Sequence, residues 1–465
     1  MTEPRPPGRL DLEELEQCIA HGEIETVVTA FPDLYGRLVG KRITGHFFLE
    51  EIAKGGMHAC DYLLACDMEM DPTPGYAFAS WETGYGDVHA VPDLATLRRA
   101  AWLDRTAILL CDVFGEEDGR PVPVAPRQIL QRQLARLRER GLHAYMGSEL
   151  EFFLFDESYA SARAKGYGDL VHSQSYIEDY HVLSSSFAEP VIGAIRRDVD
   201  ASGIPIEFSK GEWGPGQHEI NLRYAEAQEM ADRHVLYKLA AKEIAAREGK
   251  ALTFMAKVGT ELAGNSLHIH LSLRDEQGAP VFAGDEPVQE GRAARVSPTF
   301  RAALGGLLTH ARELAFFFAP NVNSYKRYRA GTFAPTTIAY SVDNRTVGFR
   351  VCGDGPSVRV ECRIPGGDAN PYLAYAALLA AALDGIEKGI DPGPAFTGDA
   401  YAAADLPHVP STLAESLQAL ASGELARSAF GDDVVEHLLH FGRTELEAAE
   451  VAVTDFERAR FFERV

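Results

Sequence analysis

Four segments beyond residue 141 alternate polar and apolar residues in the manner of β-strands. They read HAYMGSELEFFLF (143–155), HEINLRY (218–224), LHIHLSL (267–273) and VRVECRIP (358–365). Because successive side chains of a strand point to opposite faces, each segment gathers its polar residues on one face. These faces carry Glu, His and Arg, the residues that bind cations and anions. We therefore expect a curved antiparallel sheet or open barrel whose polar faces line a pocket.

Other segments have the 3.6-residue periodicity of helices. One helix is expected to begin at Pro126 and to end before Gly141, and a second to occupy residues 225–247. A third follows Asn370, a good N-cap residue, with Pro371 in the first helical position. Their apolar stripes predict core helices that take no part in chemistry.

The main change in composition lies at EEDGRPVPVAPRQIL (116–130), where a glycine and three prolines interrupt the pattern. Such residues punctuate connections between folded units. We predict an α+β protein with a small domain of mixed strands and helices over residues 1–118 and a larger domain over residues 119–465.

The 465 residues include 45 basic and 68 acidic side chains, for a formal net charge of −23. Such a surface repels phosphate backbones, so nucleic acid is not an expected partner. No stretch approaches the roughly 18 unbroken apolar residues that favour a membrane helix, and the N-terminus has no signal-peptide pattern. Six scattered cysteines without metal-binding spacing indicate reduced thiols and a cytoplasmic location.

Glu149 and Glu151 are separated by about 6 to 7 Å along one strand face. Two adjacent ionised carboxylates repel each other, so we expect the pair to bind cations. Oxygen-rich ligation with one or two imidazoles suits Mg²⁺ or Mn²⁺ better than structural zinc. Enough ligands for two divalent ions are present in Glu149, Glu151, Glu212, Glu219, His268 and Glu361.

Arginines supply positive charge beyond these metals. They are Arg327, Arg345, Arg350, Arg359 and Arg363. Metals and guanidinium groups together stabilise a phosphoryl group in transfer and hold an anionic substrate. The sequence has no P-loop, since residues 36–41 read GRLVGK, and it has neither a dinucleotide fingerprint nor a GxSxG elbow.

Seven motifs, in this order, resemble the glutamine synthetase family over nearly the whole chain. They are SELEFFLF (148–155), GPGQHEINLRY (214–224), LHIHLS (267–272), NSYKRY (323–328), NRTVGFRV (344–351), VECRIP (360–365) and ANPYLAYAALLAAALDGI (369–386). The resemblance implies an N-terminal β-grasp domain and a C-terminal catalytic domain. It also implies a homo-oligomer, a dodecamer of two six-membered rings with active sites between neighbours.

The resemblance also implies roles for individual residues. Glu151, Glu212 and Glu219 correspond to ligands of the metal near the amino acid, and Glu149, His268 and Glu361 to ligands of the metal between the ATP phosphates. Arg327 and Arg363 correspond to glutamate-binding and phosphate-binding arginines, with the backbone of Gly264 near the amino group. Arg345 and Arg350 correspond to phosphate-stabilising residues, and nucleotide contacts are expected at Tyr224, Ser272 and Arg359. Asp33 in FPDLYG (31–36) corresponds to the acid that reaches into the neighbouring subunit's site.

The chain departs from glutamine synthetases at the amine end of the site. The segment YRAGTFAP (328–335) places Phe333 where those enzymes carry a glutamate that binds and deprotonates ammonium. Ala263 replaces an asparagine that contacts the glutamate amino group. An aromatic residue in place of a proton acceptor weakens the case for ammonia and favours an amine with an apolar body.

These features are similar to the γ-glutamyl-amine ligase branch of the family. The expected reaction is ATP-dependent formation of a γ-glutamyl amide from glutamate and a primary amine such as putrescine, spermidine or ethanolamine, through γ-glutamyl phosphate. Asp33 and Glu212 are the candidates to orient the incoming ammonium form. Two alternatives stay open: a glutamine synthetase that uses ammonia despite Phe333, and a catalytically inactive relative that serves as a scaffold or regulator.

Overall fold

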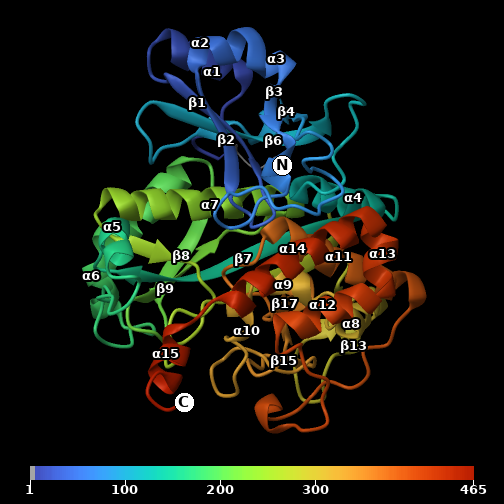
Figure 1. The fold of residues 1–465 in the computed structure, drawn as a ribbon. Helices are drawn as coiled ribbons and strands as arrows, with labels where there is room; N and C mark the ends of the chain where they lie inside the picture. The colour runs from blue at the N-terminus through green and yellow to red at the C-terminus, as the bar shows by residue number, and fades with distance from the viewer. Residues whose placement is uncertain (1–5) are drawn as a thin grey trace.

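The computed structural model describes residues 6–465, and its fold contains two sheets (Figure 1). The first sheet has the order β2-β1-β6-β4-β3, with β5 paired to β6. Its strands β1 and β6 are parallel and its other pairs antiparallel. A parallel central pair flanked by antiparallel partners fits the predicted β-grasp fold. The strands are β1 (Thr26–Pro32), β2 (Leu38–Thr44), β3 (Met57–Cys60), β4 (Asp87–Pro92), β5 (Arg98–Arg99) and β6 (Thr106–Gly115).

The second sheet has nine strands in the order β15-β16-β17-β12-β7-β9-β8, with β10 and β11 paired to β7. Its pairs are antiparallel, as expected, except for β15 and β16 at one edge, which are parallel. The strands are β7 (Leu142–Phe155), β8 (Ile206–Gly211), β9 (Gln217–Leu222), β10 (Ala225–Glu226), β11 (Ala251–Thr253), β12 (Leu267–Asp275), β15 (Tyr340–Val342), β16 (Phe349–Cys352) and β17 (Arg359–Cys362). A separate hairpin is formed by β13 (Ala283–Pro287) and β14 (Arg295–Val296).

Helices pack around both sheets, and α7 separates the N-terminal part from the second sheet in Figure 1. The first sheet carries α1 (Leu12–Ala20), α2 (Gly45–Phe47) and α3 (Ala53–Gly55). The remaining helices are α4 (Pro126–Arg138), α5 (Tyr159–Ala164), α6 (Val182–Ala201), α7 (Ala227–Arg247), α8 (Pro298–His310), α9 (Ala315–Phe318), α10 (Val322–Tyr325), α11 (Pro371–Lys388), α12 (Leu413–Ser422), α13 (Glu424–Phe430), α14 (Asp432–Val451) and α15 (Asp455–Phe461). A π-helical turn spans Phe48–Ile52, and 3₁₀ turns span Asp61–Leu64, Leu94–Thr96, Gly355–Ser357 and Ala400–Ala402.

The three helices expected from sequence are confirmed as α4, α7 and α11. Asn370 caps α11, because its side-chain oxygen accepts the backbone N–H of Tyr372 at 3.1 Å. The side-chain amide of Asn370 also donates to the backbone oxygens of Asp33 and Leu34 at 3.1 and 3.0 Å. The cap therefore ties the loop after β1 to the central helix of the catalytic part.

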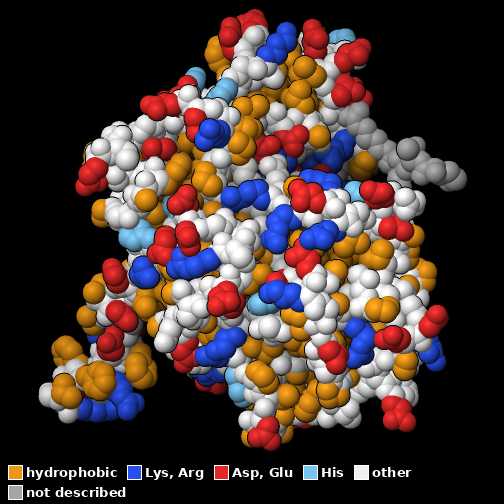
Figure 2. Space-filling view, turned by 90° about the vertical axis from the view of Figure 1, so that its right-hand side faces the viewer, with side chains coloured by type: hydrophobic (Ala, Val, Ile, Leu, Met, Phe, Trp, Pro, Cys, Tyr) orange, Lys and Arg blue, Asp and Glu red, His pale blue; other side chains and the backbone are white. Residues whose placement is uncertain are grey.

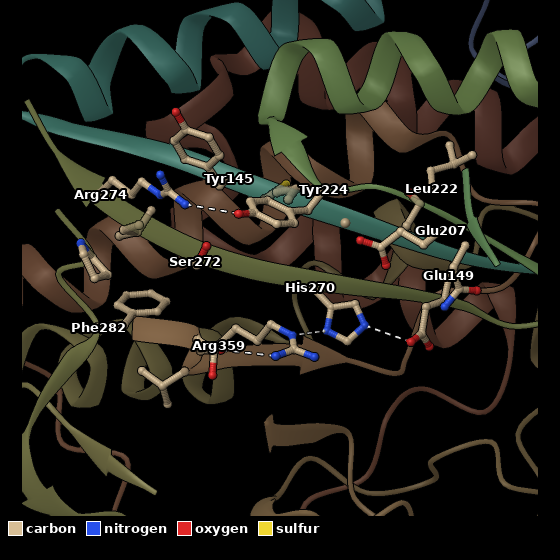
Figure 3. Close-up of a pocket in the computed structure, with 18 of the residues that line it drawn as sticks. Tyr145, Glu149, Glu207, Leu222, Tyr224, His270, Ser272, Arg274, Phe282 and Arg359 are labelled. Atoms are coloured by element: carbon tan, nitrogen blue, oxygen red, sulfur yellow. Dashed lines mark hydrogen bonds and ion pairs between the residues drawn. The ribbon is translucent and has the colours of Figure 1, made fainter. Parts of the chain in front are cut away.

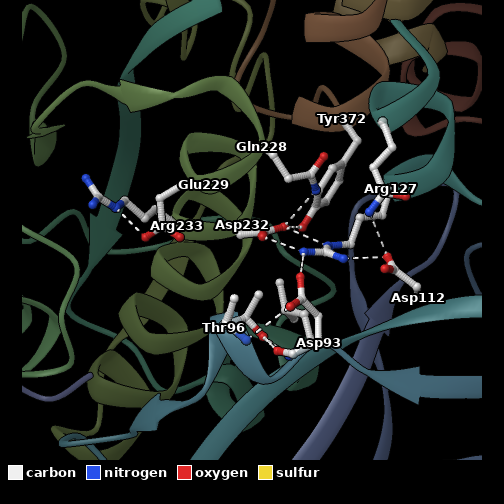
Figure 4. Close-up of polar contacts among 12 residues, drawn as sticks. Asp93, Thr96, Asp112, Arg127, Gln228, Glu229, Asp232, Arg233 and Tyr372 are labelled. Atoms are coloured by element: carbon white, nitrogen blue, oxygen red, sulfur yellow. Dashed lines mark hydrogen bonds and ion pairs between the residues drawn. The ribbon is translucent and has the colours of Figure 1, made fainter. Parts of the chain in front are cut away.

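Arg127 joins the two sheets through buried ion pairs (Figure 4). Its side chain is 2% exposed, and its guanidinium donates to both carboxylate oxygens of Asp232 in α7, at 3.1 and 2.9 Å. The same group donates to Asp93 at 2.6 Å and to Asp112, which belong to the first sheet and its connections. A buried arginine is stable only when carboxylates compensate its lost hydration. Arg127 therefore fixes α4 and α7 against the N-terminal strands.

The strands of the first sheet end at Gly115 and those of the second begin at Leu142. The expected boundary between residues 118 and 119 lies in this interval and stays a prediction. None of the helices in residues 6–465 combines the length and hydropathy that a bilayer crossing requires. All six cysteines are free thiols.

Candidate active site

The polar faces of four neighbouring strands bring the predicted metal ligands together. In the strand register, Glu151 on β7 lies opposite Glu219 on β9, and Glu149 lies opposite His268 on β12. The ligand atoms of Glu149, His268 and Glu361 all lie within 4.8 Å of one another. Those of Glu151, Glu219 and His268 form a second such group. The alternation of the strands thus brings five of the six predicted ligands into one cluster.

The chemistry of this cluster fits divalent cations. Burial, and then the charge of Glu212, raises the pKa of Glu151 to about 8. Burial, and then the charges of Glu149 and Glu212, raises the pKa of Glu219 to about 10. Buried carboxyl groups that lie side by side resist ionisation because their negative charges repel each other. Their charge can be neutralised by a bound metal ion as well as by bound protons. His268 contributes a buried ring nitrogen, Nε2, that has no hydrogen-bond partner among residues 6–465, while its Nδ1 lies 2.9 Å from Glu149.

Glu361 differs from these two acids because arginines surround it. Burial alone would raise its pKa, but the charge of Arg363 and then that of His268 lower it to about 2. Arg363 donates to one carboxylate oxygen at 2.5 Å and Arg350 to the other at 2.8 Å. Glu361 is therefore ionised and holds both guanidinium groups beside the cluster.

Glu212 lies beside the cluster and pairs with a lysine in this structure. Its carboxylate forms an ion pair with Lys210, whose ammonium group lies 4.5 Å from the centre of the Tyr180 ring. Its charge contributes to the raised pKa of both Glu151 and Glu219, so it lies within electrostatic reach of both. Its role as a sixth metal ligand stays a prediction.

Arg327 and Gly264 lie near Glu151, since the charge of Arg327 acts on this acid and Gln217 contacts both Glu151 and the backbone of Gly264. Arg327 is 1% exposed and donates to Ser266 Oγ at 3.2 Å and to the backbone oxygen of Ile364. A Cβ atom at Gly264 would lie 2.4 Å from Arg327 Cγ, so a side chain at this position would displace the arginine. The absence of a side chain thus lets Arg327 pack against the backbone of residue 264.

A cavity of about 540 Å³ adjoins the acidic cluster (Figure 3). The predicted nucleotide contacts Tyr224, Ser272 and Arg359 line it, whereas Arg350, which is predicted to stabilise the ATP phosphates, does not. Arg359 Nε donates to His270 Nδ1 at 3.1 Å, which leaves His270 Nε2 to donate to Glu149 at 3.2 Å. His270 therefore connects the cavity to the acidic cluster.

An aromatic pair lies at the part of the site that is predicted to bind the amine. Trp213 and Phe333 contact each other with ring centroids 5.9 Å apart and planes inclined by 65°. Phe333 has φ of 58°, a left-handed backbone conformation that is uncommon and strained for a side chain of this size. Arg363 holds it by donating to its backbone oxygen at 3.4 Å. Because Trp213 directly follows Glu212, the pair lies beside the acid predicted to orient the amine.

Comparison with known proteins identifies the family. Residues 123–461 match the model of the glutamine synthetase catalytic domain. The chain belongs to the glutamine synthetase family. Its α+β fold and its enzymatic nature are thereby confirmed, and members of this family depend on ATP and divalent metal ions. The relatives described next confirm its resemblance to the amine-ligase branch.

Relatives of this family enzyme resemble it over almost its full length. It is 48% identical over 456 residues to γ-glutamylethanolamide synthetase GlnA4 of Streptomyces coelicolor, covering 98% of this chain and 96% of that protein. It is 35% identical to the glutamate–isopropylamine ligase of a Pseudomonas species, covering 97% of each. The solved structure of a GmaS/ADP complex has 32% identity and a TM-score of 0.84, covering 96% of this chain and 99% of the other.

Two further predicted catalytic residues of this glutamine synthetase family member lie on connecting segments. Asp33 is buried in the loop after β1, accepts from Arg37 Nε at 2.6 Å and belongs to neither metal-ligand group found in residues 6–465. Arg345 is exposed in the turn between β15 and β16. The catalytic roles of both residues stay predictions.

Sequence reasoning missed residues that orient the predicted ligands. Gln217 donates to Glu151 at 3.4 Å, to the backbone oxygen of Gly264 at 3.0 Å and to Asn265 at 3.0 Å. Gln217 lies on β9 two residues before Glu219 and therefore on the same polar face. This spacing could have predicted its place in the site. Trp213 gave no such signal, because its loop has no periodic pattern.

Proposed function

We propose that this enzyme joins the γ-carboxylate of glutamate to a primary amine at the expense of ATP, forming a γ-glutamyl amide. The observation that carries the proposal is the contact between Trp213 and Phe333 beside Glu212. It presents apolar surface where the ammonia-using enzymes of the family carry an acid. The two curated relatives reported above are named for ethanolamine and isopropylamine, which both carry carbon on the nitrogen.

The first step transfers a phosphoryl group from ATP to the glutamate carboxylate. Tyr224, Ser272 and Arg359 would contact the nucleotide in the cavity they line. Bound Mg²⁺ or Mn²⁺ would be held by Glu149, His268 and Glu361 and by Glu151 and Glu219, with Glu212 as a further ligand, and would neutralise phosphate charge. Arg327, Arg345, Arg350 and Arg363 are assigned to the glutamate carboxylate and to the phosphoryl oxygens, where positive charge stabilises the transition state.

The second step forms the amide bond. The amine nitrogen attacks the carbonyl carbon of γ-glutamyl phosphate, the bond to phosphate breaks, and the nitrogen loses a proton. Glu212 and Asp33 are assigned to bind the ammonium form and accept that proton. Trp213 and Phe333 would contact the carbon chain of the amine and exclude water from the acyl phosphate.

We also propose a homo-oligomer, a dodecamer of two six-membered rings, in which Asp33 serves the site of a neighbouring chain. Two features support association between copies. Asp33 lies outside the acidic cluster of its own chain. The C-terminal helix α15 projects from the body (Figures 1 and 2). Phe456 in this helix and Phe462 directly after it are 67% and 86% exposed. Exposed apolar patches on such elements commonly mark interfaces.

We propose ethanolamine, putrescine and spermidine as candidate amines, with ethanolamine first because the 48% identical relative is named for its ethanolamide product. The presence of all the predicted metal-ligating acids argues against an inactive scaffold, because buried carboxylates without cations destabilise a fold. The free thiols agree with the proposed cytoplasmic location.

A phosphate-release assay with glutamate, ATP and Mg²⁺ tests the proposal. Ethanolamine, isopropylamine, putrescine, spermidine and ammonium are compared at equal concentrations. We expect one or more of the carbon-bearing amines to support faster turnover than ammonium. Faster turnover with ammonium than with every amine would favour a glutamine synthetase, and absence of turnover with metal and ATP bound would favour the scaffold.

A further inference from the structure

The outer face of the first sheet carries a block of four metal-binding side chains on the paired strands β3 and β4 (Figure 1). The antiparallel register places His58 opposite His89 and Cys60 opposite Asp87. The residues that alternate with them along both strands are buried, so these four side chains share the other face. None of the four lines the nucleotide cavity or belongs to the acidic cluster. The reaction therefore leaves this block without a role.

Both imidazole rings of the block are oriented by a hydrogen bond at one nitrogen. His58 Nδ1 lies 3.0 Å from a carboxylate oxygen of Glu116, and His89 Nε2 lies 2.5 Å from the backbone oxygen of Gly55. Because a carboxylate and a carbonyl oxygen accept hydrogen bonds, each of these nitrogens carries the hydrogen and the other ring nitrogen keeps its lone pair. Histidines that bind metal ions are typically held in this way, with the second nitrogen donating to a carboxylate or a carbonyl. His58 Nε2 and His89 Nδ1 are therefore the candidate ligand atoms.

The separation of the two rings suits a shared ion. Their centroids lie 5.6 Å apart, with planes inclined by 17°. Two imidazoles that bind one zinc ion at about 2.0 to 2.1 Å and at a tetrahedral angle have centroids about 5 Å apart. Within residues 6–465 the ligand atoms of the block do not already lie within 4.8 Å of one another, unlike those of the acidic cluster. His58 and Asp87 are exposed, so they are free to turn toward an ion.

The donor atoms of the block select a different kind of ion from those of the acidic cluster. Imidazole and thiolate ligands favour zinc and similar transition metals, whereas oxygen-rich ligation favours Mg²⁺. Of the six cysteines, all of which lie in the described part of the chain, Cys60 alone is partly exposed. Cysteine binds metal as the thiolate, so binding releases the thiol proton to solvent. Two imidazoles, one thiolate and one carboxylate complete a tetrahedral set of ligands.

We propose that this face of the first sheet binds a transition-metal ion such as Zn²⁺ through His58, Cys60, Asp87 and His89. The ion is separate from the metal ions of the reaction, and the hydrogen bonds described above orient the two imidazoles. Sequence spacing gave no sign of this site, because strand pairing brings together residues from two segments that are far apart in the chain.

The bound ion closes the base of a long connection. The segment 61–86 leaves β3 directly after Cys60 and enters β4 at Asp87, so the ion holds both of its ends. Apart from a 3₁₀ turn over Asp61–Leu64, this segment has no helix or strand, and its Trp81 is 78% exposed. A ligand that binds only the closed arrangement stabilises that arrangement by mass action. The ion therefore makes local opening of the segment 61–86 rarer.

Absorption spectroscopy of the full-length protein with Co²⁺ tests the site directly. A thiolate bound to Co²⁺ gives a charge-transfer band in the near ultraviolet, which the acids and the imidazole of the acidic cluster do not give. In excess Mg²⁺, we expect this band to saturate at about one Co²⁺ per chain and to be displaced by Zn²⁺. Cys60→Ser should abolish the band. Cys18→Ser, at the cysteine of α1 that accepts from Arg99, is the matched control and should keep it.

The same band tests the histidines. His58→Gln and His89→Gln should each weaken Co²⁺ binding at least tenfold, whereas His46→Gln, at an exposed histidine of α2, should bind as the wild type does. Glu116→Ala should weaken binding about tenfold, because it removes a group that orients a ligand without removing the ligand. Absence of a saturable band, a band that persists in Cys60→Ser, or full binding by both histidine variants would overturn the proposal.

Limited proteolysis tests the effect on the connection. Chymotrypsin cleaves after exposed aromatic residues, so Trp81 reports opening of the segment 61–86. In excess Mg²⁺, Zn²⁺ should slow this cleavage at least fivefold in the wild type and leave its rate in Cys60→Ser unchanged. Equal slowing in both proteins, or none in the wild type, would contradict closure of the segment by the ion. None of these measurements needs turnover, so they decide the site independently of the proposed function.

Discussion

The indole ring of Trp213 contacts the phenyl ring of Phe333 at a centroid separation of 5.9 Å, joining two segments that are 120 residues apart in the chain. One segment carries Glu212, and the other carries Phe333 where we predict that the ammonia-using relatives have an acid. The contact makes the proposed amine end of the site apolar on one side and acidic on the other. Such a surface suits an ammonium group that is attached to carbon.

Phe333→Glu should shift the preference of the enzyme from amines toward ammonium. The new carboxylate can accept a proton from ammonium, and its charge leaves less apolar surface for the alkyl chain. We expect the ratio of kcat/KM for ammonium to kcat/KM for ethanolamine to rise about tenfold or more, which corresponds to about 1.4 kcal/mol. Phe333→Leu is the control, since it keeps apolar surface without adding an acid. An unchanged ratio in Phe333→Glu would contradict the assignment.

Trp213→Ala should raise KM for carbon-bearing amines more than it changes KM for ATP. Loss of the ring removes apolar contact and one half of an aromatic pair, which together contribute about 1 to 2 kcal/mol. The expected rise in KM for isopropylamine is therefore about fivefold to thirtyfold. Trp81→Ala, at a tryptophan 78% exposed on the N-terminal part, should leave this KM unchanged. Equal rises for amine and ATP would indicate a general structural defect instead.

Removal of divalent metal should lower the thermal stability of the protein. With a chelator, the acids of the cluster face one another without a cation, whereas excess Mg²⁺ stabilises the folded state by mass action. We expect Mg²⁺ to raise the melting temperature of the wild type by several degrees and to raise that of Glu219→Gln much less. Glu117→Gln, at an exposed acid of the connecting segment, should respond as the wild type does. A full Mg²⁺ response in Glu219→Gln would remove Glu219 from the metal site.

Arg127→Met should strongly destabilise the contact between the two sheets. Removal of the guanidinium leaves Asp232, which is also buried, without its charged partner, and such losses cost about 3 to 5 kcal/mol. Urea unfolding with two spectroscopic probes measures the change. Arg140→Met, which removes an exposed ion pair with Glu387, should change stability by about 0.5 kcal/mol or less. A comparably small loss in Arg127→Met would show that this network contributes little.

Local patterns were sufficient to predict a good part of this molecule. The alternation of β7, β9, β12 and β17 fixed which side chains share a face, and strand pairing then placed Glu149, Glu151, Glu219, His268 and Glu361 together. The N-cap of α11 was likewise predictable from the sequence, because N-cap preferences depend on the type of the capping residue itself. These predictions succeed because side-chain direction follows from the backbone repeat.

Features that depend on tertiary contacts could not be predicted from the sequence. Arg127 gave no signal in the sequence, since its three carboxylate partners come from separate elements. The parallel pairing of β15 with β16 depends on the path of the intervening turn. The position of Trp213 against Phe333 depends on two loops, where no periodicity constrains direction. Asp33 was assigned by resemblance alone, and its own chain holds it against Arg37.

His437 predicts a loss of stability in mild acid. This residue of α14 is 5% exposed, and its Nε2–H donates to the backbone oxygen of Leu64 at 2.8 Å. Burial lowers its pKa to about 4, against an ordinary value of 6.5. The unfolded chain therefore binds this proton more readily than the folded protein does. The stabilising effect of neutral His437 is complete above pH 6.5 and is lost as the pH falls toward 4.

Over that interval, His437 alone should contribute a loss of about 3 kcal/mol in the free energy of unfolding. Urea unfolding at pH 7, 6, 5 and 4.5 measures the slope, and His437→Gln, which keeps a side-chain donor but does not titrate, should flatten it. His46→Gln is the control, because His46 is exposed on α2 and its loss should leave the slope unchanged. Buried His218, whose pKa burial also lowers to about 4, keeps a residual slope in the variant. If the free energy of unfolding of His437→Gln falls with decreasing pH as steeply as that of the wild type, protonation of His437 is not what makes the stability of the protein depend on pH.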